Sequence, residues 1–187
     1  MGNLYIGLLH YPVLNKEGKP SISALTGLDV HDIARSAKTY GVERFFVVTP
    51  LPTQQGIAAR IKRYWLESKV DHNRSEALRL VRIVARYEDS VKLIEKAEGQ
   101  KPLLIGTSAR ELGLPRLKYK ELRRWLASDP RPVYILFGTA WGLTEGLLRR
   151  LDYLLEPIYG PGEYNHLSVR AAVATILDRL RGRRENE

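Results

Sequence analysis

The sequence contains no cysteine. Disulfide bonds, thiolate catalysis and cysteine-based zinc sites are therefore excluded. The sequence also shows no leader of the signal-peptide type and no apolar run long enough to span a membrane. These absences together favour a cytoplasmic protein that has no membrane partner.

Several motifs of well-known enzyme classes are also missing. No G-x-x-x-x-G-K-[ST] loop is present, and Gly160–Asn165 only approximates G-x-G-x-x-G because Asn165 stands in place of the third glycine. The four histidines form no H-x-x-x-H pair and no cluster with metal-binding spacing, so we predict no metal site. Ser108 and Ser168 lie outside any G-x-S-x-G elbow, which argues against acyl-enzyme chemistry.

Positive charge is in excess, with 30 Lys and Arg residues against 21 Asp and Glu residues and a net charge of +9. This excess suits a polyanionic partner such as nucleic acid, although a soluble basic protein would also have it. The 187 residues can form one sizeable core. We see no repeat, low-complexity tract or linker, so we predict a single domain over residues 1–187 with a disordered tail at 182–187.

Apolar runs alternate with segments of helical periodicity along the chain, which predicts an α/β fold. The sheet should be mostly parallel, with helices on both faces. We expect strands at 4–10, 44–49, 80–85, 102–106 and 132–137 and a short one near 154. We expect helices at 28–40, 53–68, 88–98, 119–127, 144–150 and 169–180, with residues 11–25 as a loop and 71–79 as either loop or helix. Asp29 could cap the first helix, and Asn165 or Ser168 the last.

Three apolar runs end in similar small residues, at Ile105–Ser108, Phe137–Ala140 and Ile158–Gly162. If the strands are parallel neighbours, these loops emerge at the same edge of the sheet, where α/β proteins bind small ligands. Small residues let the backbone approach a flat, adenine-like ring closely. The alternative is an ordinary turn before a final core helix.

Two segments resemble motifs of the SPOUT superfamily of RNA methyltransferases. Leu28–Pro50 looks like the first motif, in which Asn-x-Gly-Asn-Ile-x-Arg is followed by an alanine-rich helix, a glycine, a strand and a proline. Asn165–Ala174 is similar to the last motif, an Asn and a Ser before an alanine-rich helix. The sequence departs from the first motif at Asp29 and His31, which replace Asn and Gly. The chain looks closest to a small, uncharacterised bacterial branch of the superfamily.

The resemblance implies a deep trefoil knot over about residues 103–180, with the last helix threaded through an earlier loop. It also implies that S-adenosylmethionine (SAM) binds in the knot, between the three loops described above. The cofactor-binding residues that the resemblance implies are Thr107, Ser108, Ala109, Phe137, Gly138, Thr139, Trp141, Gly142, Leu143, Ile158, Tyr159, Gly160, Asn165, His166, Leu167 and Ser168.

The resemblance further implies a homodimer whose active site is completed across the interface. Arg35 matches the arginine that acts on the acceptor hydroxyl in family members that methylate ribose. A guanidinium stays protonated, so Arg35 would orient the hydroxyl and stabilise the developing alkoxide rather than accept a proton. Asp29 and His31 lie within about a helical turn or two of Arg35 and could accept that proton.

RNA, either tRNA or rRNA, would then bind the basic segments of the chain, because Lys and Arg neutralise phosphates. The RNA-binding candidates are Arg60, Lys62, Arg63, Lys118, Lys120, Arg123 and Arg124. The sequence thus predicts a SAM-dependent RNA methyltransferase that modifies a ribose 2′-oxygen or a base nitrogen. One alternative is a non-catalytic RNA-binding protein that retains the knotted fold, and another is a different nucleotide-using enzyme with a doubly wound sheet.

Overall fold

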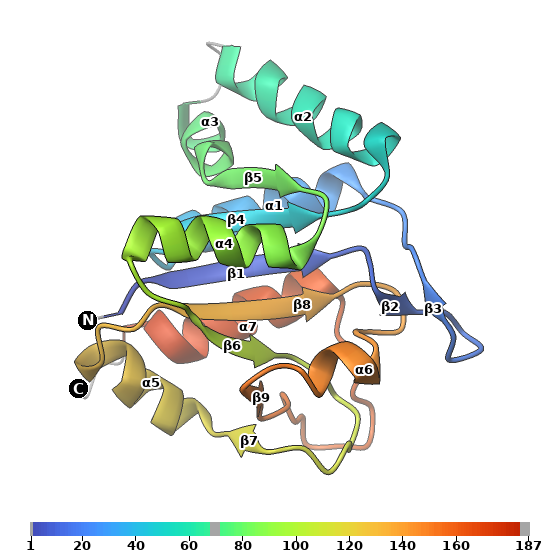
Figure 1. Cartoon of the computed structure of the whole chain (residues 1–187), viewed down its shortest axis with the longest axis vertical. Helices are drawn as coiled ribbons and strands as arrows, with labels where there is room; N and C mark the ends of the chain where they lie inside the picture. Colours follow the sequence, from blue (N-terminus) through green and yellow to red (C-terminus); the bar gives the residue numbers. More distant parts are fainter. Residues whose placement is uncertain (1, 68–71, 184–187) are drawn as a thin grey trace.

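The computed structural model describes residues 2–67 and 72–183, and its centre is a parallel sheet of seven strands (Figure 1). The strands lie in the order β5-β4-β1-β8-β6-β9-β7. Their bounds are β1 (Leu4–Leu9), β4 (Arg44–Val48), β5 (Val81–Val84), β6 (Leu103–Gly106), β7 (Arg116–Leu117), β8 (Val133–Gly138) and β9 (Tyr153–Leu155). All pairings in this sheet are parallel, so the carboxyl ends of its strands meet at one edge.

Strand β1 lies in the interior of the sheet and is buried along its whole length. Leu4, Ile6 and Leu8 belong to one hydrophobic core, and Tyr5 and Leu9 belong to the other. This separation follows from the two-residue period of a strand, in which successive side chains point to opposite faces. A continuous apolar run, rather than an alternating one, is what a strand covered on both faces requires.

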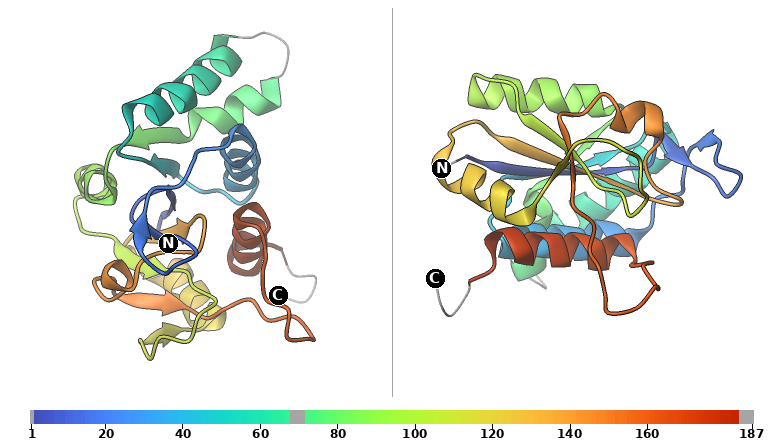
Figure 2. Two further views of the ribbon diagram at one scale, coloured as in Figure 1. Left: turned by 90° about the vertical axis from the view of Figure 1, so that its right-hand side faces the viewer. Right: turned by 90° about the horizontal axis from the view of Figure 1, so that it is seen from below.

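Helices cover both faces of the sheet, as Figure 2 shows in its view from below. The helices are α1 (Gly27–Thr39), α2 (Pro52–Glu67), α3 (His72–Arg79), α4 (Tyr87–Glu98), α5 (Tyr119–Ser128), α6 (Glu145–Leu148) and α7 (Val169–Arg181). Helices α4 and α6 contribute to one core, whereas α1, α2, α3, α5 and α7 contribute to the other. No helix in the described part of the chain is long and apolar enough to cross a membrane.

The predicted α/β architecture is confirmed, and the segment at 71–79 proves to be helical over the described residues 72–79. The predicted loop at 11–25 was wrong in part, because β2 (Val13–Leu14) and β3 (Pro20–Ser21) form an antiparallel hairpin there. The edge strand β7 was also missed. In the predicted tail, residues 184–187 lie outside the described residues.

The cap predicted for the first helix was wrong. Thr26, not Asp29, is the N-cap of α1, and its hydroxyl accepts a hydrogen bond from the Asp29 backbone N–H at 3.2 Å. Asp29 therefore lies within the first turn, where the positive end of the helix dipole stabilises a carboxylate. At α7, Ser168, one of the two predicted caps, is the N-cap, and its hydroxyl accepts from the Ala171 N–H at 3.2 Å.

The order of strands in the second half of the chain departs from their order in the sequence. Strand β9 lies between β6 and β7, although β7 precedes it in the chain. The segment between β6 and β7 therefore passes the position of β9. After β9, the chain continues through residues 156–168 into α7, on the face opposite α6 (Figure 2).

Candidate functional site

A pocket of about 880 Å³ lies at the carboxyl ends of β8, β6 and β9. Its walls come from the three loops that follow these strands, from one side of α7 and from the segment that leads into α1. The residues that line it are Ser23, Ala24, Thr26, Asp29, Thr107, Ser108, Ala109, Arg110, Phe137, Gly138, Thr139, Ala140, Trp141, Gly142, Leu155, Glu156, Pro157, Ile158, Asn165, His166, Leu167, Ser168, Val169, Ala172 and Ile176.

The loop after β8 turns back so tightly that Gly138 has no room for a side chain. A Cβ atom at this position would lie 2.6 Å from the Leu143 backbone nitrogen and 2.9 Å from the Gly142 carbonyl carbon. Both of these are backbone atoms, which cannot move aside without moving the loop. The close approach therefore explains the glycine and fixes the shape of this wall of the pocket.

The β2–β3 hairpin holds the same loop from the other side. The Leu14 N–H donates to the Gly142 carbonyl at 2.8 Å, and the Trp141 N–H donates to the Leu14 carbonyl at 3.2 Å. Within the turn, Ala140 has φ of 51° and Gly142 has φ of 91°. A positive φ is uncommon for alanine and persists only where the surroundings impose it. The hairpin and the tight turn thus fix the backbone that carries Trp141.

A chain of polar side chains, of which His10 and Thr139 are buried and Ser23 is half-buried, connects β1 to the pocket. The Thr139 hydroxyl donates to the Leu9 carbonyl at 3.0 Å, so its oxygen accepts from the Ser23 hydroxyl. The Ser23 oxygen in turn accepts from His10, whose Nδ1 lies 2.9 Å away. This direction requires the proton of a neutral His10 to reside on Nδ1. Burial lowers the pKa of His10 to about 4, against the opposing effect of Asp29, and so keeps the ring neutral.

Asp29 is the acidic side chain that α1 contributes to the pocket, and it is only 9% exposed. Its carboxylate accepts from the Thr26 hydroxyl at 2.7 Å. Arg170, near the beginning of α7, lies 3.7 Å from the carboxylates of both Asp29 and Asp32. These contacts join the first turns of α1 and α7 and orient the Asp29 carboxylate at the pocket wall.

The loop after β6 is fixed mainly by contacts to main-chain carbonyls. The Thr107 hydroxyl donates to the Leu136 carbonyl at 2.9 Å, and the Arg110 backbone N–H donates to the Ser108 hydroxyl at 3.1 Å. The Arg110 guanidinium donates to the Leu143 carbonyl at 2.6 Å. The first loop is therefore tied to the second, and both keep their place relative to the pocket.

The loop after β9 leaves its backbone open to a ligand. Within the described residues, the backbone N–H groups of residues 158–167 donate no hydrogen bond to other backbone groups. Pro157 and Ile158 add apolar surface beside Leu155, and Ile176 extends that surface from α7. The third wall thus offers apolar contact together with free main-chain donors, the combination that a flat ring with a polar edge needs.

The structure brings most of the predicted cofactor-binding residues together at this pocket. Thirteen line it: Thr107, Ser108, Ala109, Phe137, Gly138, Thr139, Trp141, Gly142, Ile158, Asn165, His166, Leu167 and Ser168. Three others do not. Leu143 is buried beneath the loop, where its carbonyl accepts from Arg110. Tyr159 and Gly160 are exposed, and the Tyr159 hydroxyl donates to Glu111 at 3.3 Å.

The three residues predicted to be catalytic lie at different places on α1. Asp29 lines the pocket, whereas His31 and Arg35 do not. His31 packs edge-on against Trp65, with ring centroids 5.7 Å apart, and burial lowers its pKa. Arg35 is exposed on the helix surface. One copy of the chain therefore places only Asp29 beside the pocket.

The two basic segments lie on the surface of α2 and around α5. Of the predicted RNA-binding residues, Arg60, Arg63, Lys118, Lys120 and Arg124 are exposed, and Arg123 is half-buried. Lys62 differs from them, because its ammonium group donates to the Val81 carbonyl at 2.7 Å, and burial lowers its pKa. Trp65 and Trp125, the tryptophans of these two segments, pack against the core.

Sequence reasoning missed one wall of the pocket. Ser23, Ala24 and Thr26 line it, although the first two belong to the predicted loop at 11–25 and Thr26 lies between that loop and the predicted helix at 28–40. The signal that could have found them is local. A threonine three residues before an aspartate, at the start of an apolar helical pattern, marks an N-cap. A cap placed at Thr26 would have brought the preceding residues to the carboxyl end of β1.

Comparisons with known proteins agree with this geometry. A family model described as SAM-dependent RNA methyltransferase matches residues 3–182. An uncharacterized protein of Aquifex aeolicus is 42% identical over 181 residues, which cover 95% of this chain and 88% of that protein. The tRNA (guanine-N(1)-)-methyltransferase of Oleidesulfovibrio alaskensis is 43% identical over 96% of this chain, but the match spans only 42% of that enzyme.

The fold has solved counterparts as well. A methylase family protein from Neisseria gonorrhoeae superposes with a TM-score of 0.63 at 18% identity, over 100% of this chain and 84% of the other. At this identity the likeness shows the fold alone. The family match, by contrast, spans nearly all of the sequence and includes every loop of the pocket. The chain belongs to the SAM-dependent RNA methyltransferase family.

Proposed function

We propose that the pocket at the carboxyl ends of β6, β8 and β9 binds SAM and that the chain transfers its methyl group to a ribose 2′-oxygen or a base nitrogen of tRNA or rRNA. The observation that carries the proposal is the convergence of three loops on one pocket, with Gly138 holding the middle loop in a tight turn. Family membership supplies the cofactor and the RNA class of substrate.

The residues present fit SAM in size and chemistry. A volume of about 880 Å³ lies within the range of pockets that enclose small molecules. Apolar side chains and free main-chain N–H groups of the third loop suit the adenine ring and its polar edge. Glu156 adds negative charge for the ammonium group, and Asp29 adds negative charge for the sulfonium, which SAM carries and SAH lacks.

When bound, SAM supplies a methyl group that its sulfonium already makes electrophilic. The protein then needs to hold the acceptor in place and remove its proton. Asp29 is the proton acceptor in this proposal, because its carboxylate is mostly buried, lines the pocket and is oriented by Thr26 and Arg170. His31 is less suited, because it lies outside the pocket against Trp65.

Arg35 enters the reaction from a second copy of the chain. It is exposed and does not line the pocket of its own copy, so a homodimer is the arrangement that would bring it to an acceptor. Exposed apolar side chains near the beginnings of α1 and α7, Leu28 and Leu167, give such an interface apolar surface to bury. In the dimer, Arg35 orients the acceptor hydroxyl and stabilises its developing charge.

The knot is part of the proposal. Its support is the order of β6, β9 and β7 in the sheet, which lets the chain after β9 pass beneath the segment that joins β6 to β7. Helix α7 would then be threaded through that segment. A single domain over residues 1–187 is also part of the proposal, because strands from both halves of the chain share one sheet. A threaded α7 would hold the third loop against the first two and so keep the pocket closed on one side.

The methylated nucleotide cannot be taken from the named relative. This chain matches less than half of the Oleidesulfovibrio enzyme, so the action of that enzyme on guanine in tRNA can reside in the unmatched part. The exposed cations of α2 and α5 support RNA as the partner, since Lys and Arg neutralise phosphates. We therefore propose tRNA or rRNA in a cytoplasmic setting, with ribose oxygen and base nitrogen both open as acceptors.

Calorimetric titration with S-adenosylhomocysteine (SAH), the demethylated product of SAM, tests the pocket directly. One site per chain is expected, and the absence of binding would overturn the proposal. The dimer is tested by mixing two inactive variants, Arg35→Ala and a variant with a blocked pocket, Gly138→Val. If sites are shared, mixed dimers contain one intact site and regain part of the activity. A mixture as inactive as its components would refute the shared site.

A further inference from the structure

Two properties distinguish Trp141 from the other tryptophans of the chain. It lines the pocket, yet 63% of its surface is exposed. Among the described residues, no aromatic ring stacks on it and no cation lies over it. Trp65 and Trp125, in contrast, pack against the core. An indole left uncovered at the mouth of a binding pocket is free to contact a ligand there.

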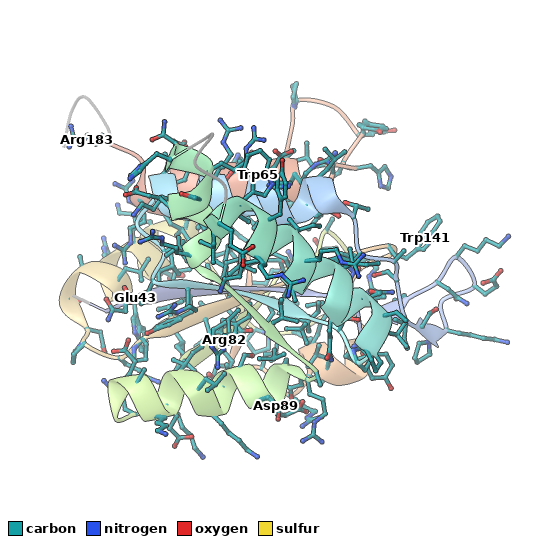
Figure 3. All side chains as sticks on the ribbon, turned by 90° about the horizontal axis from the view of Figure 1, so that it is seen from above. Glu43, Trp65, Arg82, Asp89, Trp141 and Arg183 are labelled. Atoms are coloured by element: carbon teal, nitrogen blue, oxygen red, sulfur yellow. The ribbon has the colours of Figure 1, made fainter. Side chains whose placement is uncertain are left out.

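The position of this indole is fixed by the backbone around it. Ala140 and Gly142, on either side, both have positive φ, and the hydrogen bonds of Leu14 attach the turn to the β2–β3 hairpin. Figure 3 shows Trp141 at the edge of the molecule, on the side of this hairpin. Strained backbone that persists at a binding site points to a functional requirement. The strain here serves to present Trp141 outward rather than to bury it.

We infer that Trp141 stacks against the nucleobase of the target nucleotide. The inference rests on the proposed function, because an acceptor atom can reach a methyl donor in the pocket only through its open side. A nucleotide at that opening must have its base unstacked from the RNA helix, since neighbouring nucleotides otherwise cover the reacting atom. An exposed, pre-positioned indole offers the base a new stacking partner and offsets part of the cost of leaving the helix.

The charges near Trp141 favour a nucleic acid over an apolar partner. The hairpin that holds the turn carries the exposed cations Lys16 and Lys19 and one exposed carboxylate, Glu17, which lies 3.8 Å from Lys16, so its net charge is positive. Arg110 adds a cation that lines the pocket itself. Phosphates on either side of an extruded nucleotide would meet these positive groups. The cofactor is a poorer partner for the indole, because a ligand enclosed by the three loops would leave most of the exposed surface of Trp141 uncovered.

The test compares three variants: Trp141→Ala, Trp141→Phe and Trp141→Leu. Phenylalanine keeps an aromatic face, whereas leucine keeps apolar bulk without one. The assay follows transfer of labelled methyl from SAM to bulk RNA from cells that lack the gene, with SAH calorimetry on each variant. The alanine and leucine variants should lose about 5- to 150-fold in kcat/KM for RNA, the usual effect of removing one stacked base contact. The phenylalanine variant should regain most of that loss, and SAH affinity should stay within twofold.

Three results would overturn the inference. Loss of SAH affinity in Trp141→Ala would make the residue part of the cofactor site. Unchanged kcat/KM in that variant would exclude any contact with the acceptor. A dimer that dissociates in sedimentation experiments only when Trp141 is replaced would place the indole between two copies. Failure of the proposed function itself is distinguishable, because the unmodified protein would then bind no SAH.

Discussion

Gly138→Ala is the substitution whose effect follows most directly from the structure. The added methyl group would lie 2.6 Å from the Leu143 nitrogen. That distance is about 0.9 Å short of an ordinary contact of roughly 3.5 Å. Since the obstacle is backbone, the segment 139–143 has to move by nearly that amount. Such a shift disturbs the hydrogen bonds to Leu14 and displaces one wall of the pocket.

We expect two measurable consequences of Gly138→Ala. Overpacking of this kind costs about 1–3 kcal/mol of the free energy of unfolding, which urea denaturation would report. Because a displacement near 1 Å removes well-placed contacts to a bound ligand, SAH affinity in calorimetry should fall at least tenfold, or roughly 1.4 kcal/mol. An affinity within twofold of that of the unmodified protein would refute the assignment of this loop to the cofactor site.

Two other glycines provide matched controls. A Cβ atom at Gly56, inside α2, would meet no atom within 4 Å, so Gly56→Ala should stabilise the helix by about 0.5–1 kcal/mol and leave SAH affinity unchanged. At Gly106, the nearest atoms belong to the ends of leucine side chains, including Leu148 Cδ2 at 2.7 Å. Gly106→Ala should therefore be milder than Gly138→Ala, because side-chain ends can rotate away.

Three further predictions test the groups around the pocket. The pKa of His10 is about 4 in the folded chain and near 6.5 in the unfolded chain, so the unfolded state gains a proton first as the pH falls from 6.5 to 4. The free energy of unfolding should drop by about 3 kcal/mol over that range. His10→Asn keeps a donor near the Nδ1 position and should remove this pH dependence, as denaturation at several pH values would show. An unfolding free energy that varies with pH equally in the variant and the unmodified protein would refute the role of His10. Asp29→Asn should lower the single-turnover methylation rate by roughly 10²-fold or more with little change in SAH affinity, and an unchanged rate would exclude Asp29 as the proton acceptor. Arg124→Ala should weaken RNA binding and reduce the slope of log K against log salt by about 1, and an unchanged slope in filter binding would remove Arg124 from the RNA contacts.

The architecture could be predicted from the sequence because its strands are long apolar runs. The buried run at β1 and the run that forms β8 leave little choice but interior strands of a parallel sheet. Such a sheet brings the residues after its strands to one edge. For this reason the sequence alone predicts that the loops that begin at Thr107 and Gly138 lie together at one pocket.

The features that were missed depend on contacts between distant segments. Strand β7 is two residues long, and its pairing with β9 cannot be seen in its own sequence. The β2–β3 hairpin is equally short and is fixed partly by the turn at Gly142. The wrong cap at Asp29 reflects a local competition, since Thr26 and Asp29 are both good capping residues. In the structure Thr26 caps the helix, and Asp29 lies 3.7 Å from Arg170 of α7 instead.

The most direct test of the whole account is mass spectrometry of the nucleosides from tRNA and rRNA of cells with and without the gene. An RNA methyltransferase with the pocket described above predicts that one methylated nucleoside disappears from one RNA class when the gene is removed. Restoring the gene should restore that nucleoside, whereas the Gly138→Val variant should not. Identical nucleoside profiles with and without the gene would contradict the central claim.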